Sequence, residues 1–130
     1  MRGIMTQKRP LSPHLMIYRP QLTSMMSITH RLSGVALASG SIFLVWWLVA
    51  LAYGGDYYQM VQGIAEHVLG RLALLGFYVA VSYHMANGIR HLFWDFGIGL
   101  SLDGVYRGGY IVIGFTALSA LAGIAILFLA

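Results

Sequence analysis

Three long apolar runs constrain the fold of this 130-residue chain more than any other feature of its sequence. They cover residues 32–53, 68–89 and 110–129. Each has about 20 residues, so as a helix each matches the roughly 30 Å hydrocarbon core of a bilayer. Hydrophobic residues make up 58% of the chain and charged residues only 9%, which leaves little polar surface for a soluble domain. The sequence therefore predicts an all-α membrane protein with three transmembrane helices.

The remaining segments predict how this unit is divided. We expect residues 1–130 to form a single membrane-anchor domain, with residues 1–31 as an N-terminal arm and helix start and residues 32–129 as the three-helix region. Gly54-Gly55-Asp56 is expected to break the chain after the first span, and the glycines between residues 97 and 109 to form a flexible join. The chain has no cysteine, which excludes disulfides, thiolate-ligated iron–sulfur clusters and covalent c-type haem.

The distribution of lysine and arginine predicts the orientation of the chain in the membrane. Five of the eight basic residues precede residue 32, and residues 54–67 contain neither lysine nor arginine. Because cytoplasmic loops carry the excess of these residues, we expect the N-terminus in the cytoplasm and the C-terminus in the periplasm. The expected location is the bacterial cytoplasmic membrane rather than the mitochondrial inner membrane.

His84 is the strongest candidate for a functional residue. It lies within an apolar run, and an ionisable residue inside a membrane span is costly enough to indicate function. Imidazole is well suited to ligate a haem iron from within a helix. Gly76, Ala80 and Gly88 share its helix face at intervals of four, which would let a flat macrocycle approach. The alternatives are a histidine that hydrogen-bonds across a helix pair and a stripe that packs helices.

A second group of polar residues precedes the first span. Ser27 and Arg31 lie one helical turn apart, with His30 adjacent. A hydroxyl, an imidazole and a guanidinium can bind the carbonyl oxygens of a quinone or the carboxylates of haem propionates. Alternatively, Arg31 and His30 are positive-inside anchors and Ser27 is a helix cap. Farther along the chain, Arg90 and Asp95 are close enough in sequence for a local ion pair.

Helix geometry limits which residues can share one iron. His91 lies seven residues from His84, about 10 Å along a helix axis, whereas two axial nitrogens on one iron lie about 4 Å apart. A bis-histidine iron therefore needs a ligand from another helix. A partner chain is the simplest source, and the sequence leaves His30 open as the other. The step from Gly34 to Ala38 and the stripe around His84 predict close packing against further helices.

Two motifs carry a family resemblance. The first is Arg9-Pro10-Leu11 followed by Ser27-x-x-His30-Arg31-x-Ser33, and the second is His84-x-x-x-Gly88-Ile89-Arg90-His91-Leu92-x-Trp94-Asp95-x-Gly97. In this order, and placed in this way relative to three spans, they resemble the two signatures of the cytochrome b556 subunits of succinate dehydrogenase. The resemblance covers essentially the whole chain, with no departure at a motif position.

The resemblance implies a large membrane-anchor subunit of respiratory complex II. In that family a flavoprotein and an iron–sulfur subunit pass electrons from succinate to ubiquinone, and a haem b lies between two anchor subunits that each give one axial histidine. By position, His84 would be the axial ligand, Ser27 and Arg31 would be quinone-site residues, and His30 and Arg31 would lie near the haem propionates. We also expect His91 in the vicinity of the propionates.

Two other functions compete with this one. An anchor of a quinol:fumarate reductase runs the reverse reaction, and the sequence does not indicate direction. A small proton-coupled transporter would use His84 as a relay, but no span contains an acidic residue or a helix-breaking proline. The expected partners are the second anchor, the iron–sulfur subunit, the flavoprotein and membrane lipid, with no nucleic acid.

Overall fold

A computed structural model describes residues 19–129, and within them every regular element is a helix. The helices are α1 (Leu22–Tyr53), α2 (Gly55–Glu66), α3 (Val68–Asp95) and α4 (Leu102–Leu129). Of these, α1, α3 and α4 are long and apolar enough to cross a membrane. The all-α fold with three spans is confirmed. The expectations for residues 1–18, including the arm and the motif Arg9-Pro10-Leu11, lie outside the described residues.

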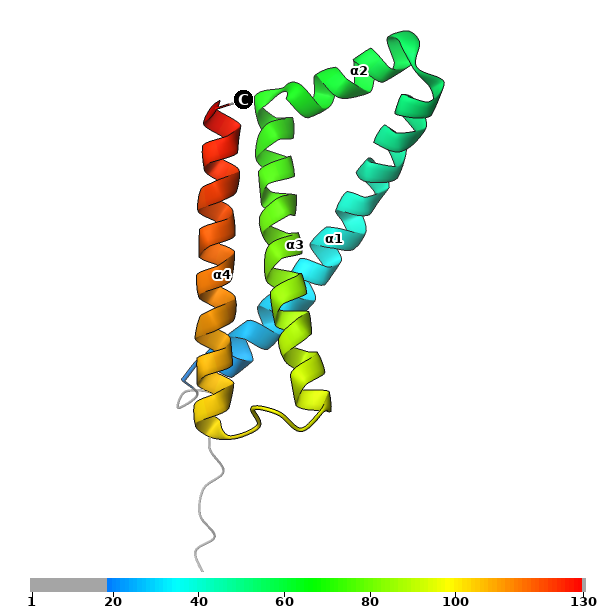
Figure 1. Ribbon diagram of the computed structural model, residues 1–130. Helices are drawn as coiled ribbons and strands as arrows, with labels where there is room; N and C mark the ends of the chain where they lie inside the picture. The colour runs from blue at the N-terminus through cyan, green and yellow to red at the C-terminus, as the bar shows by residue number, and fades with distance from the viewer. Residues whose placement is uncertain (1–18, 130) are drawn as a thin grey trace, which may run out of the picture.

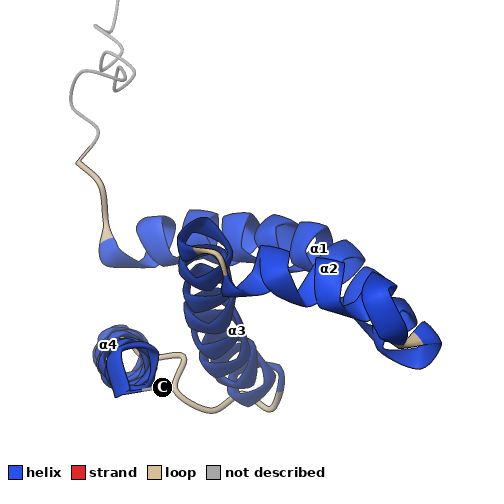
Figure 2. Cartoon of the chain, turned by 90° about the horizontal axis from the view of Figure 1, so that it is seen from above, coloured by secondary structure: helices blue, strands red, loops and turns tan. Residues whose placement is uncertain are grey.

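The three long helices meet at one end of the molecule, and toward the other end α1 diverges from α3 and α4 (Figure 1). α3 and α4 run side by side, whereas α1 crosses them obliquely and is joined back to α3 by α2. Figure 2 shows α4 end-on and α2 lying along the direction of α1. We call the region where the start of α1, the end of α3 and the start of α4 meet the converging end, and the opposite region the α2 end.

Each of the long helices extends beyond its apolar run. α1 begins at Leu22 rather than near residue 32, directly after Pro20 and Gln21. α3 continues to Asp95, where Gly97 takes a φ of 75°. There the amides of Gly97 and Ile98 donate to the carbonyls of Trp94 and Phe93, the bonding pattern of a Schellman turn. Because a polar turn can continue a helix, hydropathy alone does not reveal where the helices end.

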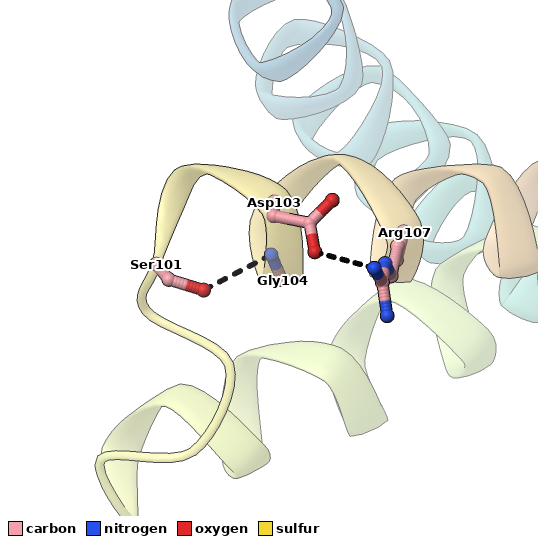
Figure 3. Close-up of polar contacts among 4 residues, drawn as sticks. All are labelled: Ser101, Asp103, Gly104 and Arg107. Atoms are coloured by element: carbon pink, nitrogen blue, oxygen red, sulfur yellow. Dashed lines mark hydrogen bonds and ion pairs between the residues drawn. The ribbon is translucent and has the colours of Figure 1, made fainter.

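The start of α4 replaces much of the predicted flexible join. The amide of Gly104 donates to Ser101 Oγ at 3.1 Å, so Ser101 caps the helix (Figure 3). Asp103 lies in the first turn, where the helix dipole favours a negative charge, and pairs with Arg107 at 2.7 Å. The expectation of an unstructured join as far as residue 109 was therefore wrong, because a cap and an i,i+4 ion pair stabilise a helix despite its glycines.

α2 was not predicted, although the break before it was. Gly54 and Gly55 have φ values of 68° and 60°, which reverse the chain after α1. α2 then buries Val61 and Ala65. A cavity of about 540 Å³ lies between α1, α2 and α3 and is almost entirely apolar, with residues such as Gly40, Trp47 and Phe77 in its lining. The α2 end is thus loosely filled.

Most large apolar side chains lie on the surface of the described chain. The core is a small cluster at the converging end, where Met26 of α1, Tyr83 of α3 and Val112 of α4 pack together. Such a surface would be unfavourable in water, but lipid or other membrane helices can cover it. The fold is therefore that of an integral membrane protein.

Candidate functional site

The imidazole of His84 lies against α1 at the converging end. Its Nδ1 is 3.0 Å from Ser33 Oγ and 3.2 Å from the backbone carbonyl oxygen of His30. Ser33 Oγ in turn donates to the same carbonyl at 2.8 Å. A carbonyl only accepts, so Nδ1 carries the proton and Nε2 keeps its lone pair.

Gly34 allows this close approach of α1 and α3. A Cβ atom at residue 34 would lie 3.2 Å from His84 Cε1 and 3.8 Å from Nδ1. Gly34 therefore packs against the imidazole of its own chain, and the packing of the step from Gly34 to Ala38 against further helices stays a prediction. On α3, by contrast, a Cβ atom at Gly76 or Gly88 would meet nothing within 4 Å. The stripe predicted to admit a macrocycle is therefore open within the described chain.

Three histidines gather beside one another. The rings of His30 and His84 are stacked, with centroids 4.0 Å apart and an interplanar angle of 11°. The ring centres of His91 and His30 are 5.4 Å apart, with an interplanar angle of 36°. The rings of His91 and Trp94 are nearly perpendicular, with centres 4.9 Å apart. Within residues 19–129 no group of three or more His, Cys, Asp or Glu side chains is arranged to hold a metal ion by itself.

The stacking also settles the geometry between His30 and His84. Two axial imidazoles each bond the iron at about 2 Å, which places their ring centres about 6 Å apart on opposite sides of it. Parallel rings at 4.0 Å leave no room for an iron between them. In this arrangement His30 does not stand where the second axial ligand of a His84-bound iron would stand.

Ser27 and Arg31 lie one turn apart on α1, as the sequence indicated. Ser27 is half-buried and Arg31 is exposed. No side-chain hydrogen bond or ion pair involves either of them among the contacts described for residues 19–129. Both side chains are thus available to a ligand or to a neighbouring subunit at the converging end.

Arg90 has a role that the sequence did not indicate. It is only 8% exposed, its Nη2 donates to the Val105 carbonyl at 2.7 Å, and its Nη1 donates to Asn87 Oδ1 at 3.2 Å. Its guanidinium also lies 4.1 Å from the ring centre of Trp94. The ion pair expected with Asp95 is absent from the described residues, where the only ion pair joins Asp103 and Arg107. Arg90 instead fastens the end of α3 to α4.

Further buried polar groups surround this arginine. Tyr83 donates its hydroxyl to the Met26 carbonyl at 2.9 Å, which ties α3 to α1. Within the described part of the chain, His30 Nδ1, Asn87 Nδ2 and Arg90 Nε are buried and have no hydrogen-bond partner. Because buried polar atoms are nearly always paired, this concentration marks the converging end as the specialised part of the molecule. Ser33, three residues after His30 in the first motif, was the missed residue most open to detection.

Comparison with known proteins identifies the family. The family described as "Succinate dehydrogenase/Fumarate reductase transmembrane subunit" matches residues 5–123. The chain is 46% identical over 106 residues to the succinate dehydrogenase cytochrome b556 subunit of Rickettsia typhi, covering 82% of each chain. It is 37% identical to the cytochrome b556 subunit of Paracoccus denitrificans over 105 residues, 81% of each chain.

A mitochondrial relative extends the comparison. The chain is 40% identical over 117 residues to the succinate dehydrogenase cytochrome b560 subunit of Sus scrofa, covering 86% of this chain and 68% of the relative. The match to the family covers the converging end, all of α1, α2 and α3, and α4 as far as residue 123. The chain therefore belongs to the succinate dehydrogenase/fumarate reductase transmembrane subunit family, as a membrane-anchor subunit of the cytochrome b type.

Proposed function

We propose that this chain anchors a succinate:ubiquinone oxidoreductase in the membrane and binds one side of a haem b through His84 Nε2. The observation that carries the proposal is the pair of hydrogen bonds at Nδ1, to Ser33 Oγ and the His30 carbonyl. Histidines that ligate a metal almost always engage their other ring nitrogen in this way. The names of the relatives, cytochromes b556 and b560, support a b-type haem.

The second axial ligand would come from a partner. His30 is stacked on His84 and His91 is too far along α3, so neither suits the opposite face of the iron. The stripe of α3 at Gly76 and Gly88 is open to a neighbouring helix. We assign the second histidine to another membrane-anchor subunit, and the electron supply to an iron–sulfur subunit and a flavoprotein. The rings of His30 and His91 and the guanidinium of Arg31 would lie near the haem propionates.

Ser27 and Arg31 would form this chain's part of the quinone site. The Ser27 hydroxyl donates a hydrogen bond to a quinone carbonyl, and the Arg31 guanidinium stabilises negative charge that develops on the oxygen during reduction. Their placement on α1 at the converging end, without partners in the described chain, supports this role. The haem, when bound, supplies a one-electron store. The chain's own residues position ligands and exclude water rather than react covalently.

The orientation belongs to the same proposal. Succinate oxidation takes place on the cytoplasmic side in bacteria, so the converging end would face the cytoplasm and the α2 end the periplasm, in a bacterial cytoplasmic membrane. The excess of basic residues before the first span supports this orientation. The reverse reaction, quinol:fumarate reduction, is the second candidate, because the matched family includes transmembrane subunits of both enzymes.

A visible spectrum tests the haem assignment. Membranes with wild type, His84→Ala or His67→Ala are compared as reduced-minus-oxidised spectra, beside succinate:quinone reductase activity. His67 begins α3 at the α2 end and serves as the control. We expect the b-type band in wild type and His67→Ala and its loss in His84→Ala. An unchanged band in His84→Ala would contradict the proposed ligand, and no band in wild type would contradict the cytochrome function.

Steady-state kinetics test the quinone assignment. We expect Ser27→Ala and Arg31→Ala to impair quinone reduction while the haem content stays close to that of wild type. Arg107→Ala, an exposed arginine in the first turns of α4, is the control and should behave as wild type. Normal quinone kinetics in both Ser27→Ala and Arg31→Ala would contradict the assignment.

A further inference from the structure

We infer that Ser33 is a positioning residue for the haem ligand. Its hydroxyl, together with the His30 carbonyl, holds His84 as the tautomer protonated at Nδ1 and turns Nε2 outward. The inference rests on the proposed ligation of the haem by His84. It assigns a role to the one hydroxyl that joins α1 to the imidazole.

The direction of each hydrogen bond fixes the proton. Ser33 is 8% exposed, and its hydroxyl has a single proton, which it donates to the His30 carbonyl at 2.8 Å. The oxygen of Ser33 then faces Nδ1 of His84 as an acceptor at 3.0 Å. The His30 carbonyl, also an acceptor, lies 3.2 Å from the same nitrogen. With two acceptors before it, Nδ1 keeps its proton, and Nε2 is the nitrogen left to bind a metal.

The surroundings of the ring prevent the other orientation. The His30 ring covers one face of His84 at 4.0 Å, and Gly34 lies against its Cε1 edge. Rotation of the imidazole by 180° about its Cβ–Cγ bond would exchange Nδ1 with a carbon. Both acceptors would then face a C–H group: the Ser33 oxygen would lose its donor, whereas the His30 carbonyl would keep only the bond from the Ser33 hydroxyl. The hydroxyl of Ser33 thus contributes to the orientation as well as to the tautomer.

This contact has a consequence for the electronic properties of the iron. An N–H group that donates to oxygen makes the opposite ring nitrogen a stronger base, which stabilises the ferric state. Removal of the Ser33 oxygen leaves only the longer bond to the His30 carbonyl. We therefore expect Ser33→Ala to shift the haem midpoint potential to a more positive value and to broaden the low-spin ferric signal in electron paramagnetic resonance.

The test compares three variants in the membrane-bound complex, expressed with its partner subunits. Ser33→Ala removes the hydroxyl. Ser33→Thr keeps it, and in a helix threonine also bonds the carbonyl three or four residues earlier. Ser39→Ala is the matched control, because the Ser39 hydroxyl also bonds a carbonyl of α1, that of Val35 at 3.0 Å, with no contact to His84. The readouts are the midpoint potential, the paramagnetic resonance signal and the ratio of haem to protein.

Each outcome decides the inference. A positive shift in Ser33→Ala, with wild-type values in Ser33→Thr and Ser39→Ala, supports it. Loss of haem in Ser33→Ala supports it as well, provided that Ser33→Thr retains haem at the wild-type potential. It is overturned if Ser33→Ala matches Ser39→Ala, or if Ser33→Thr is altered as much as Ser33→Ala. If His84→Ala removes the haem while Ser33→Ala changes nothing, only the positioning role fails; if His84→Ala keeps the haem, the proposed ligation fails with it.

Discussion

The two ends of this molecule are stabilised by different interactions. At the converging end, α1, α3 and α4 are joined by buried polar side chains, including Ser33, Tyr83 and Arg90. At the α2 end the buried residues are small or aliphatic, such as Ala50, Val61 and Ala65, beside an apolar cavity, and the hydrogen bonds from Trp46 and Trp47 to α2 are exposed or half-buried. Each end has a turn in which glycines adopt positive φ, so turn chemistry does not distinguish them.

The difference indicates where geometry has to be exact. Polar groups buried away from water need specific partners, so they fix distances between helices, whereas apolar contacts tolerate sliding. The proposed ligand His84 lies at the converging end, and α1 moves away from α3 toward the α2 end (Figure 1). We therefore expect substitutions of the buried polar residues at the converging end to change the cofactor site, and substitutions at the α2 end to change stability alone.

The largest effect is expected from Arg90→Ala. This change removes the bond to the Val105 carbonyl and the stacking on Trp94, and leaves Asn87 buried without a partner. We expect a cost of about 2 to 4 kcal/mol in the free energy of unfolding, measured in mixed micelles, and a perturbed haem spectrum. Arg107→Ala, at an exposed ion pair, should cost only about 0.3 to 0.5 kcal/mol. Equal losses in the two variants would contradict the special role of the buried arginine.

Gly70→Ala addresses the α2 end. A Cβ atom there would collide with the Ile64 carbonyl and lie 2.7 Å from the Ala65 carbonyl, so backbone must move. The expected cost is about 1 to 3 kcal/mol, with an unchanged haem potential. The control is Gly63→Ala in α2, where a Cβ atom meets nothing within 4 Å; it should be neutral or stabilising by about 0.5 to 1 kcal/mol. A shifted haem potential in Gly70→Ala would show that the two ends are coupled.

Tyr83→Phe removes a single hydrogen bond at the converging end. The Met26 carbonyl would lose the hydroxyl that lies 2.9 Å from it, while the packing of the ring would remain. We expect a loss of about 1 kcal/mol in the same unfolding measurement. Tyr53→Phe, at a tyrosine that is 81% exposed, should leave the stability unchanged. A Tyr83→Phe variant as stable as Tyr53→Phe would mean that this bond does not hold α1 to α3.

The smallest effect is expected for Gln62→Leu at the α2 end. Gln62 accepts a hydrogen bond from the Trp47 indole at 3.0 Å, beside the apolar cavity. Leucine keeps the bulk of the side chain but removes this half-buried bond and the exposed bond that Gln62 donates to Glu66, so we expect a change of less than about 1 kcal/mol. Haem content and potential should match wild type. A loss as large as that of Arg90→Ala would overturn the comparison between the two ends.

The sequence predicts the spans better than their surroundings. The apolar runs located α1, α3 and α4 because about 20 apolar residues in a row are a strong signal. Hydropathy did not predict α2, which is short and begins at a pair of glycines. It also did not predict the first turns of α4, where the capping by Ser101 was not recognised. Local propensity and capping decide these elements, and hydropathy carries no information on either.

The site follows a similar division. His84 could be singled out as a candidate because histidine is rare in an apolar run, and His30 because it belongs to a motif that resembles a family pattern. The burial of Asn87 and Arg90 could not be predicted, since it depends on the angle at which α1 crosses α3 and on the approach of α4. Ser33 was part of a motif but had no predicted role, because its partner is 51 residues away in the sequence.

The imidazole of His84 is stacked on His30 and held by two hydrogen bonds, which has an entropic consequence. A side chain that is free to rotate loses about 0.5 to 1.5 kcal/mol when a ligand immobilises it. His84 is already restricted by Ser33, His30 and Gly34, so this loss occurs when the helices assemble rather than when the cofactor binds. Under the proposed ligation, the difference corresponds to roughly a two- to tenfold gain in haem affinity. The helix pair α1–α3 would therefore act as a preorganised half-site that can bind the haem before the partner helix packs over it.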